Sequence, residues 1–584
     1  MPTAESASGE PDVTRRRWSW AALALLLLGG LGLRLWGIRQ GLPYAYNLDE
    51  DTHFVPHAVA MFGGGLNPHY FANPPAFTYV LHFLFAVSYG GGAGVREALR
   101  SHPEELYTLA RVAAALLGTL ALWLLYVVGA RLFDRGVALL AAAIEAVAFL
   151  PVFYSHLALN DVPTLAPLTL SLLGTAGVLR RGRARDYLIA GVGLGLACAS
   201  KYTAGIVVLP LGAAAASAYL DGGEGRARRV LTGLGLAGAG ALGAFLLANP
   251  YALLDYSHFH AELVHQSSLS AEAQGKLGAP RDGGLLYYLW SLTWGLGWIP
   301  ALAALGGALS VWRVARRLGW LLVPAPLLFL AFMGLQGRYF GRWLLPIFPI
   351  LCLLGAFFAV RLARAAGRAL VVRRSRPRLL APGLTALIVF AVLGQGLLYS
   401  VHSGLVLSRA DTRNLTRQWM LANVPAGTPI VAEPVSPNEW ARETPPIPGG
   451  REFRWHKYAS LFSRVAADGK ISPRALRQVG IENYVTTLRP QLIDYYVRNG
   501  YCWVISGSTQ SARAFADPAA APGAVAYYRR LAAVATVAQR FSPYGAGRAP
   551  VSFNFDWSFD YYPLAYVRPG PDMTVYRLHG GRCG

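Results

Sequence analysis

The chain has 584 residues, of which 54% are hydrophobic and 14% charged, and its mean hydropathy is +0.36. A soluble domain carries roughly 25% charged residues, so this composition excludes an ordinary soluble protein and indicates a chain that crosses a membrane several times. The net charge of +22 lies in short basic clusters between apolar runs. This pattern is typical of cytoplasmic loops that face anionic lipid and disfavours nucleic-acid binding.

The N-terminal segment is polar as far as Asp12, and three arginines then precede a long apolar run that ends at Arg34. A cleaved signal peptide is the alternative interpretation. The run is about 20 residues long, which is enough to span a bilayer, and it has no convincing cleavage site. We therefore expect a cytoplasmic tail at 1–17 and a retained first span.

Six basic clusters set the expected orientation of the chain. They are Arg15–Arg17, Arg131 with Arg135, Arg180–Arg185, Arg226–Arg229, Arg313–Arg317 and Arg361–Arg378. Placing all six in the cytoplasm predicts eleven spans. The spans are expected near 18–38, 107–130, 136–154, 163–179, 187–200, 203–220, 230–249, 287–312, 318–335, 343–360 and 379–400.

One further apolar run, Phe77–Tyr89, is too short to be an ordinary span. If it crossed the membrane, Arg131 and Arg135 would move to the outer side, against the positive-inside rule. We expect it to rest on or dip into the outer face, within a long loop at 39–106. A second outer loop is expected at 250–286.

The segment Asn47-Leu48-Asp49-Glu50-Asp51 places three carboxylates just outside the first predicted span. A carboxylate at a membrane surface can act as a general base on an acceptor hydroxyl or amine. Two or three carboxylates can also hold a divalent cation. The alternative is a solvated acidic loop without a chemical role.

A second polar pair, Asn160 and Asp161, falls at the outer end of the predicted span 163–179. Pro163 is expected in the first turn of that helix, and Asp161 could cap it. Asp161 could also work with the acids of the first loop, and the two roles are compatible.

Basic residues also occur on the predicted outer side, against the general trend. They are Lys201, followed by Tyr202, and Arg338 and Arg342 in the segment 336–349. The planar donor fork of arginine suits a phosphate group, so these residues are candidates to bind an anionic ligand. The alternative is that their side chains reach toward lipid headgroups.

The loop at 44–89 is rich in aromatic side chains, which can stack on sugar rings or form an interfacial belt. Candidate sugar or loop contacts are His53, Tyr70, Asn73 and Pro74. His53 and His57 also have a spacing suited to a metal, but Pro56 is expected to disturb a regular helical pair.

The C-terminal region, 401–584, is expected to form an extracytoplasmic α/β domain with its own core. Asp411 is a predicted N-cap for a helix at Thr412–Asn423, and a second helix is expected at Pro490–Asn499. Strands are expected at Ile430–Ala432, Asn483–Thr487 and Tyr501–Ile505. Cys502 and Cys583 could pair if the domain lies outside the cytoplasm.

Several motifs, taken in order, resemble the membrane-embedded C-type glycosyltransferases. The branch is the dolichyl-phosphate-mannose-protein mannosyltransferase family and its bacterial aminoarabinose-transferase-like relatives. The motifs are Leu48-Asp49-Glu50, Asn73-Pro74-Pro75, Asn160-Asp161-Val162-Pro163, Ser200-Lys201-Tyr202-Thr203, Gly337-Arg338-Tyr339, Leu344-Leu345-Pro346 and the segment 411–427. The last third of the chain shows no β-trefoil pattern, so the resemblance gives no support for protein Ser/Thr as the acceptor.

The resemblance implies transfer of a hexose or pentose from a polyprenyl-phosphate carrier, with inversion, to a protein, lipid or glycan acceptor outside the cytoplasm. Asp49 would be the catalytic base and Glu50 its supporting acid, while Asp161 and Asn160 would position the acceptor or a metal. Lys201, Tyr202, Arg338 and Arg342 would bind the carrier phosphate. A divalent cation at Asp49, Glu50 and Asp161 is the one cofactor considered.

The sequence therefore predicts a polytopic α-helical membrane protein with about eleven transmembrane helices. A catalytic module at 18–400 precedes the α/β domain. The high content of Ala, Gly, Arg and Leu suggests a bacterial source and hence the inner membrane, with membrane lipid as a partner. The alternatives are a transporter or flippase for a lipid-linked sugar, which would need polar groups near the midplane, and an envelope-polymer-binding protein.

Overall fold

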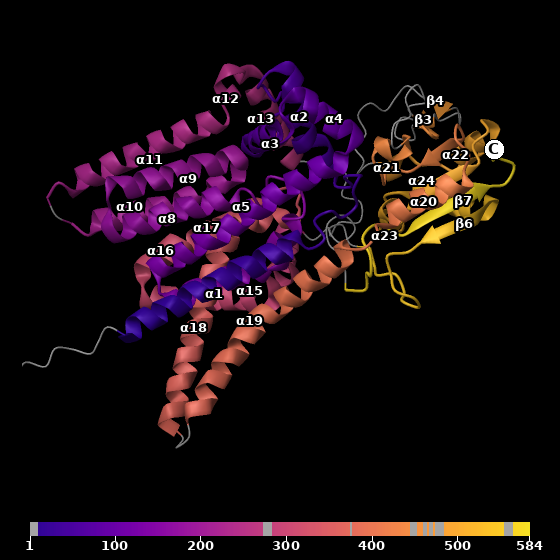
Figure 1. The fold of residues 1–584 in the computed structure, drawn as a ribbon. Coiled ribbons are helices and arrows are strands. Elements are labelled where there is room, and N and C mark those ends of the chain that lie inside the picture. Colours follow the sequence, from indigo (N-terminus) through magenta and orange to yellow (C-terminus); the bar gives the residue numbers. More distant parts are fainter. Residues whose placement is uncertain are drawn as a thin grey trace, which may run out of the picture.

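The computed structural model describes residues 10–222, 224–271, 283–373, 377–443, 453–458, 464–465, 471–472, 484–553 and 564–583. A helical bundle forms one part and a sheet-containing domain the other (Figure 1). The first nine residues of the predicted tail and 272–282 of the predicted second outer loop lie outside the described residues, as does Asn483.

The bundle is built from helices up to α19. They are α1 (Glu10–Leu35), α2 (Val55–Gly64), α3 (Ala76–Tyr89), α4 (Gly92–Ser101), α5 (Pro103–Leu132), α6 (Arg135–Val147), α7 (Phe149–Tyr154), α8 (Leu165–Arg181), α9 (Ala184–Ser200), α10 (Val208–Leu220), α11 (Arg226–Ala248), α12 (Tyr251–Leu254), α13 (Tyr256–Ala271), α14 (Gly284–Leu292), α15 (Trp298–Val314), α16 (Arg316–Leu322), α17 (Pro324–Gly334), α18 (Phe348–Arg373) and α19 (Pro377–Leu407). Single π-helical turns occur at η1 (Glu50–Phe54) and η3 (Thr293–Gly297), and 3-10 turns at η2 (Tyr202–Val207) and η4 (Gly341–Ile347).

The local sequence explains why the long helix α5 begins and ends where it does. Pro103 occupies the first turn, where its missing N–H costs no hydrogen bond. Glu104 and Glu105 lie in the same turn, and Arg131 lies in the last turn. Each charge therefore opposes the partial charge of the helix end that it occupies.

Helix occupies part of each of the eleven predicted ranges, so the polytopic helical class is confirmed. Within the described residues, seven helical stretches are long and apolar enough to cross a membrane: Pro103–Leu132, Tyr202–Leu220, Arg226–Ala248, Gly284–Val314, Arg316–Gly334, Gly341–Ala369 and Ala381–Asn423. The other predicted spans are shorter or interrupted, and their crossing stays a prediction. The run Phe77–Tyr89 lies in α3, a helix of 14 residues.

The short helices α2, α3, α4, α12 and α13 gather at the end of the bundle that also carries the C-terminal domain (Figure 1). They belong to the two predicted outer loops, which are far apart in sequence. Helix α11 leads into α12 at its C-terminal end. At its N-terminal end, Arg226 and Arg229 line one small pocket with Arg180 and Arg181 of α8. These short helices and these four arginines thus lie at different ends of α11.

The C-terminal domain holds a mixed five-stranded sheet in the order β2-β1-β5-β7-β6. Its strands are β1 (Pro429–Ala432), β2 (His456–Tyr458), β5 (Trp503–Gly507), β6 (Ala535–Phe541) and β7 (Met573–Leu578), and a separate pair is β3 (Arg464–Val465) with β4 (Ile471–Ser472). Strand β1 is parallel to β2 and β5, whereas β7 is antiparallel to β5 and β6. The helical elements are α20 (Thr412–Asn423), η5 (Asn438–Ala441), α21 (Tyr484–Thr487), α22 (Gln491–Arg498), α23 (Ser508–Ala516) and α24 (Pro522–Val534).

Most local expectations for this domain are confirmed. Asp411 caps α20 by accepting a hydrogen bond from the Arg413 N–H, α22 lies within its expected range, and β1 and β5 overlap theirs. The expected strand at Asn483–Thr487 is wrong, because its described residues form α21. Tyr484 and Val485 are buried in the core beside α24, and this packing overrides the strand preference of Tyr, Val and Thr.

Cys502 and Cys583 form a disulfide across 81 residues of sequence, so the pairing considered from the sequence does occur. It joins the start of β5 to the segment that follows β7. Since those strands are neighbours in the sheet, the bond fastens the end of the chain to the centre of the domain.

Close packing of α9 against α8 and α11 depends on small residues. Gly191 and Gly195 of α9 lie against the backbone of Ala237 and Ala241 in α11, where any Cβ would overlap a carbonyl oxygen. Small residues at a spacing of four let helix backbones approach closely inside a membrane. By contrast, a Cβ on Gly235 would meet nothing within 4 Å.

We therefore expect Gly191→Ala to destabilise the bundle by about 1–3 kcal/mol, the usual range for overpacking a tight contact. The matched control is Gly235→Ala in α11, which adds the same methyl group to open space and should leave stability unchanged or slightly raised. Thermal unfolding of the purified protein in detergent measures both. Equal midpoints for the two variants would contradict the packing role of Gly191.

Candidate active site

The acidic segment begins a helical turn, and Asn47 explains why. The Asn47 Oδ1 atom accepts hydrogen bonds from the N–H groups of Asp49 at 3.1 Å and Glu50 at 3.3 Å. Asparagine is a preferred residue at such a start because its side chain satisfies amides that the helix leaves open. The turn then continues through η1 into α2, so successive acids point in different directions.

Glu50 points into the protein. Its two carboxylate oxygens accept hydrogen bonds from Arg111 Nε at 2.7 Å and Nη2 at 2.8 Å, and the Ala158 N–H donates to Oε1 at 2.9 Å. The Arg111 guanidinium also donates to the Ile38 and Gln40 carbonyls. Both side chains of the pair have 0% exposure. Glu50 thus joins the first loop, α5 and the segment before α8.

Asp49 points to a different set of partners. Its Oδ2 atom accepts a hydrogen bond from Arg342 Nη2 at 2.7 Å. The Nε atom of the same guanidinium lies 3.7 Å from Asp161 Oδ2, and Lys201 Nζ donates to Asp161 Oδ1. The side chains therefore form a row of alternating charge, Asp49, Arg342, Asp161 and Lys201. Asp49 keeps 31% of its side chain exposed, and Asp161 only 5%.

Four separate segments deliver this row. Asp49 precedes η1, Asp161 precedes α8, Lys201 lies between α9 and η2, and Arg342 lies in η4. The Arg342 guanidinium also lies 4.6 Å from the centre of the Phe340 ring, a cation–π contact that helps to fix its direction. Residues that the sequence could place only on a common side of the membrane thus meet at one point.

The neighbours of these residues orient the segments. Asn160 Nδ2 donates to the Ser200 carbonyl at 2.6 Å, which ties the segment before α8 to the end of α9. Tyr202 Oη donates to the Phe71 carbonyl at 2.9 Å. Arg338 lies near the end of α13, where its backbone N–H donates to the Ser270 carbonyl.

The expectation that Asp161 caps a helix opened by Pro163 is wrong. Helix α8 begins at Leu165 and its N-cap is Thr164, so Pro163 lies before the helix. The Asp161 carboxylate instead faces Lys201 and Arg342. Two nearby cations outweigh the weaker attraction of a helix N-terminus.

The aromatic loop covers the row through Tyr70. The Tyr70 ring stacks on the rings of both His53 and His57, with centroids 4.9 and 4.8 Å away. Both histidines therefore share one face of the helical segment. The segment is nevertheless not a regular α-helix: His53 lies in the π-helical turn η1, and Pro56 lies at the start of α2 directly after it, so the irregularity expected near this proline is present. Asn73 Nδ2 donates to Tyr70 Oη, and Pro74 follows in the same loop.

The stack also reaches the acid row, because His53 Nε2 lies 3.8 Å from Asp49 Oδ1. The first outer loop is fastened on its other side to the C-terminal domain. Tyr46 Oη donates to Asn414 Oδ1 of α20, and the Asn414 amide donates to the Gly41 carbonyl. Arg413 lies over the Tyr46 ring at 3.6 Å.

Sequence reasoning missed Arg111, Glu262 and Asn414. Arg111 carried a readable signal, since a charged residue within an apolar helix usually has a buried partner. Glu262 accepts hydrogen bonds from the Phe71 and Ala72 N–H groups and so holds the aromatic loop. Nothing in the sequence near Glu262 or Asn414 indicates these contacts.

The three acids considered for a divalent cation are engaged by basic side chains. Arg111 covers Glu50, and Arg342 and Lys201 cover Asp49 and Asp161. As arranged, these carboxylates do not fit a metal. Within the described ranges, the group whose ligand atoms lie close enough is His69, Asp255 and His258.

Comparison with known proteins gives one sequence match and several structural ones. Residues 105–252 match the family described as dolichyl-phosphate-mannose-protein mannosyltransferase. The oligosaccharyltransferase AglB of Archaeoglobus fulgidus, in complex with an inhibitory peptide and a dolichol-phosphate, has a TM-score of 0.51 and 13% identity, covering 91% of this chain and 74% of that one. An oligosaccharyltransferase of the same archaeon, tethered to an acceptor peptide, has a TM-score of 0.50 and 12% identity, covering 90% of this chain and 73% of that one.

ArnT from Cupriavidus metallidurans bound to undecaprenyl phosphate has a TM-score of 0.46 and 13% identity, covering 97% of this chain and 99% of that one. None of the curated proteins matches the chain significantly in sequence. The match to AglB shows that this polytopic membrane protein shares the fold of that enzyme. With the match of residues 105–252, it confirms the resemblance that the motifs indicated.

The buried pair generates a prediction about stability. Glu50→Ala leaves the Arg111 guanidinium buried without its carboxylate, which should cost about 3–5 kcal/mol. Because Glu50 and Arg111 contact each other, the double variant with Arg111→Ala should lose less than the sum of the two single losses. Thermal unfolding of the full chain tests both statements.

The matched control is Asp51→Asn, one residue away, which keeps the shape of a side chain that accepts a 3.2 Å hydrogen bond from Tyr107. It should unfold near the wild-type temperature. If the losses in unfolding free energy of the Glu50 and Arg111 variants were strictly additive, the ion pair would not stabilise the fold as its geometry indicates.

Proposed function

We propose that the protein transfers a sugar from a polyprenyl-phosphate carrier to an acceptor. The observation that carries the proposal is the row of alternating charge in which Arg342 bridges Asp49 and Asp161 while Lys201 holds Asp161. AglB, which shares the fold, was captured with a dolichol-phosphate. A carrier of that chemical class suits a site with two cations at a loop-covered end of a membrane bundle.

The two cations are suited to the carrier phosphate. Arg342 and Lys201 are mostly buried, and carboxylates satisfy their charges. A phosphate offers more acceptor oxygens than a carboxylate, and the arginine fork can bind it in two places. When a phosphate binds, Arg342 can turn from Asp49 toward the ligand without losing a charged partner.

That exchange would also release Asp49 for catalysis. The freed carboxylate, the most exposed member of the row, would accept the proton of the acceptor. The acceptor oxygen or nitrogen would bond to the anomeric carbon as the bond from that carbon to the phosphate oxygen breaks. Polyprenyl phosphate would leave with both bonding electrons, and attack opposite the leaving group would invert the anomeric centre.

His53 would support the proton transfer. Burial, the larger effect, lowers the pKa of His53 below its usual value, although Asp49 beside it acts in the opposite direction. A neutral ring at pH 7 could receive a proton from Asp49 and pass it to solvent once their present separation of 3.8 Å closes to hydrogen-bond distance. Tyr70, stacked on this ring, would offer a surface for the sugar.

Glu50 is better suited to positioning than to chemistry. Its carboxylate oxygens are occupied by Arg111 and the Ala158 N–H, and the pair is fully buried. We therefore assign the base to Asp49 alone, with Glu50 holding the turn that presents it. Asp161 would orient Lys201, and Asn160 would hold their two segments together.

Together with this assignment of the site, we propose the membrane topology that the sequence predicts. The arginines around one end of α11 and the loops at its other end support an extracytoplasmic site beside the C-terminal domain. The proposal includes a cytoplasmic tail at 1–17, a transmembrane catalytic module at 18–400 and an extracytoplasmic domain at 401–584. The acceptor would approach from the same side, where α20 contacts the first loop.

Asp49→Asn should lower transfer at least about a hundredfold, because an amide cannot take the acceptor proton. Binding of polyprenyl phosphate should persist, since Lys201 and Arg342 are unchanged. Turnover of polyprenyl-phosphate sugars by membranes carrying the variant measures the first quantity. Asp51→Asn is the matched control and should keep wild-type turnover, and equal loss in both variants would refute the assignment of the base.

Lys201→Gln and Arg342→Gln should each weaken binding of a short-chain polyprenyl phosphate by about tenfold or more, the value of one charge-assisted hydrogen bond. Arg39→Gln removes an exposed arginine from the first loop and serves as the control. Direct titration of the purified proteins gives the three dissociation constants. Unchanged affinity in both site variants would place the phosphate elsewhere.

A further inference from the structure

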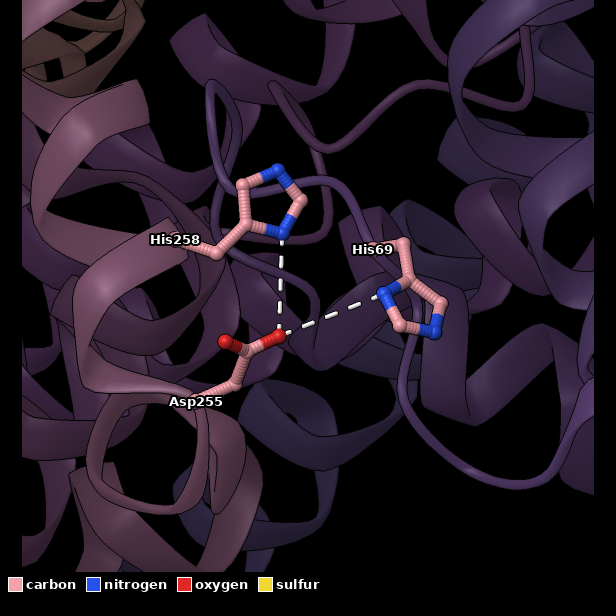
Figure 2. A group of neighbouring side chains, drawn as sticks. All are labelled: His69, Asp255 and His258. Atoms are coloured by element: carbon pink, nitrogen blue, oxygen red, sulfur yellow. Dashed lines mark ion pairs between the residues drawn. The ribbon is translucent and has the colours of Figure 1, made fainter.

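Two histidines and an aspartate meet outside the acid row, and the proposed transfer uses none of these three side chains. His258 Nδ1 lies 3.6 Å from Asp255 Oδ2, and His69 Nδ1 lies 4.0 Å from the same oxygen. Both rings point toward this carboxylate (Figure 2). His69 belongs to the first outer loop, and the other two belong to the α12–α13 segment.

The separations are close to those of a metal site. Ligand atoms about 2.0–2.2 Å from a tetrahedral zinc ion lie about 3.3–3.5 Å from one another. The three ligand atoms here lie within 4.8 Å of one another, and the two measured pairs need to close by only a few tenths of an ångström. Two imidazoles and one carboxylate form a ligand set that zinc and similar divalent metals prefer.

The surroundings orient each ligand. His258 Nε2, the ring nitrogen that faces away from Asp255, lies 3.3 Å from Glu262 Oε1. A carboxylate behind a metal-binding histidine fixes the ring and its tautomer. Asn67 Nδ2 donates to Asp255 Oδ2 at 2.8 Å, and Asn67 Oδ1 accepts the His69 N–H at 3.0 Å. One asparagine therefore positions both remaining ligands.

The backbone at His69 adds an independent observation. Among the residues that the structure describes, His69 is the only one other than glycine with a positive φ, at 47°. Such a conformation is uncommon for residues other than glycine, and backbone strain of this kind clusters at functional sites. Here it turns the imidazole toward Asp255.

We propose that His69, Asp255 and His258 bind one divalent transition metal ion of the zinc type, which fastens the first outer loop to α13. The same Glu262 that backs His258 also accepts hydrogen bonds from Phe71 and Ala72, next to Tyr70. The ion thereby steadies the loop that carries the Tyr70 ring over His53 and Asp49. Its fourth position is open to water, since most of the His69 side chain is exposed.

The test is metal binding by the full-length protein, purified without a histidine tag and treated with chelator. Titration with Zn²⁺ should show one equivalent bound with defined affinity. Glu262→Gln should weaken it about 10–100-fold, as is usual for groups behind a ligand, and His258→Ala and His69→Ala should weaken it further. His260→Ala, an exposed histidine of the same helix, is the matched control and should bind as the wild type does.

A second measurement tests the fastening. Zn²⁺ should slow amide hydrogen exchange in residues 66–75 of the wild type and leave it unchanged in His258→Ala. Asp49→Asn should bind Zn²⁺ normally, so the result is independent of the assignment of the base. Binding without one-to-one stoichiometry, or equal loss in His260→Ala and His258→Ala, would overturn the proposal and indicate adventitious binding by surface histidines.

Discussion

The buried Glu50–Arg111 pair is the contact on which the arrangement of the site depends. A guanidinium and a carboxylate without any exposure are stable only when each finds its full set of partners. Arg111 reaches the Ile38 and Gln40 carbonyls as well as Glu50, and Glu50 accepts the Ala158 N–H. The pair thus fixes the turn that presents Asp49 relative to α5 and to the segment that carries Asp161.

The row from Asp49 to Lys201 uses charge in a different way. Its members balance one another, so the site can hold two cations beside the apolar bundle without a bound anion. Because Asp49 is partly exposed while Asp161 is not, an entering phosphate would displace the Asp49 end of the row more easily. The rigid Glu50–Arg111 pair and the exchangeable partners of Asp49 would together suit the proposed transfer from a phosphate carrier.

The outer loops and the C-terminal domain complete the enclosure from two sides. Asn414 and Arg413 of α20 hold the residues that lead into the acidic segment, so the domain is coupled to the position of Asp49. On the other side, Glu262 of α13 holds the aromatic loop. The proposed metal ion would reinforce this second connection, which otherwise depends on the hydrogen bonds that Glu262 accepts from the first outer loop.

The sequence by itself determined the class of fold, the presence of helix in the eleven predicted ranges, four elements of the C-terminal domain (α20, β1, α22 and β5) and the set of polar residues worth considering. These follow from apolar runs, arginine clusters and capping residues, which act over short distances along the chain. Only the tertiary structure decided how the acids divide their work: adjacent residues of one turn point to different partners, Arg111 for Glu50 and Arg342 for Asp49. These partners lie 61 and 293 residues away along the chain, and no local pattern encodes the side to which a carboxylate turns. The same reason explains the short helix at Tyr484, where burial against α24 overrode the local preference for a strand.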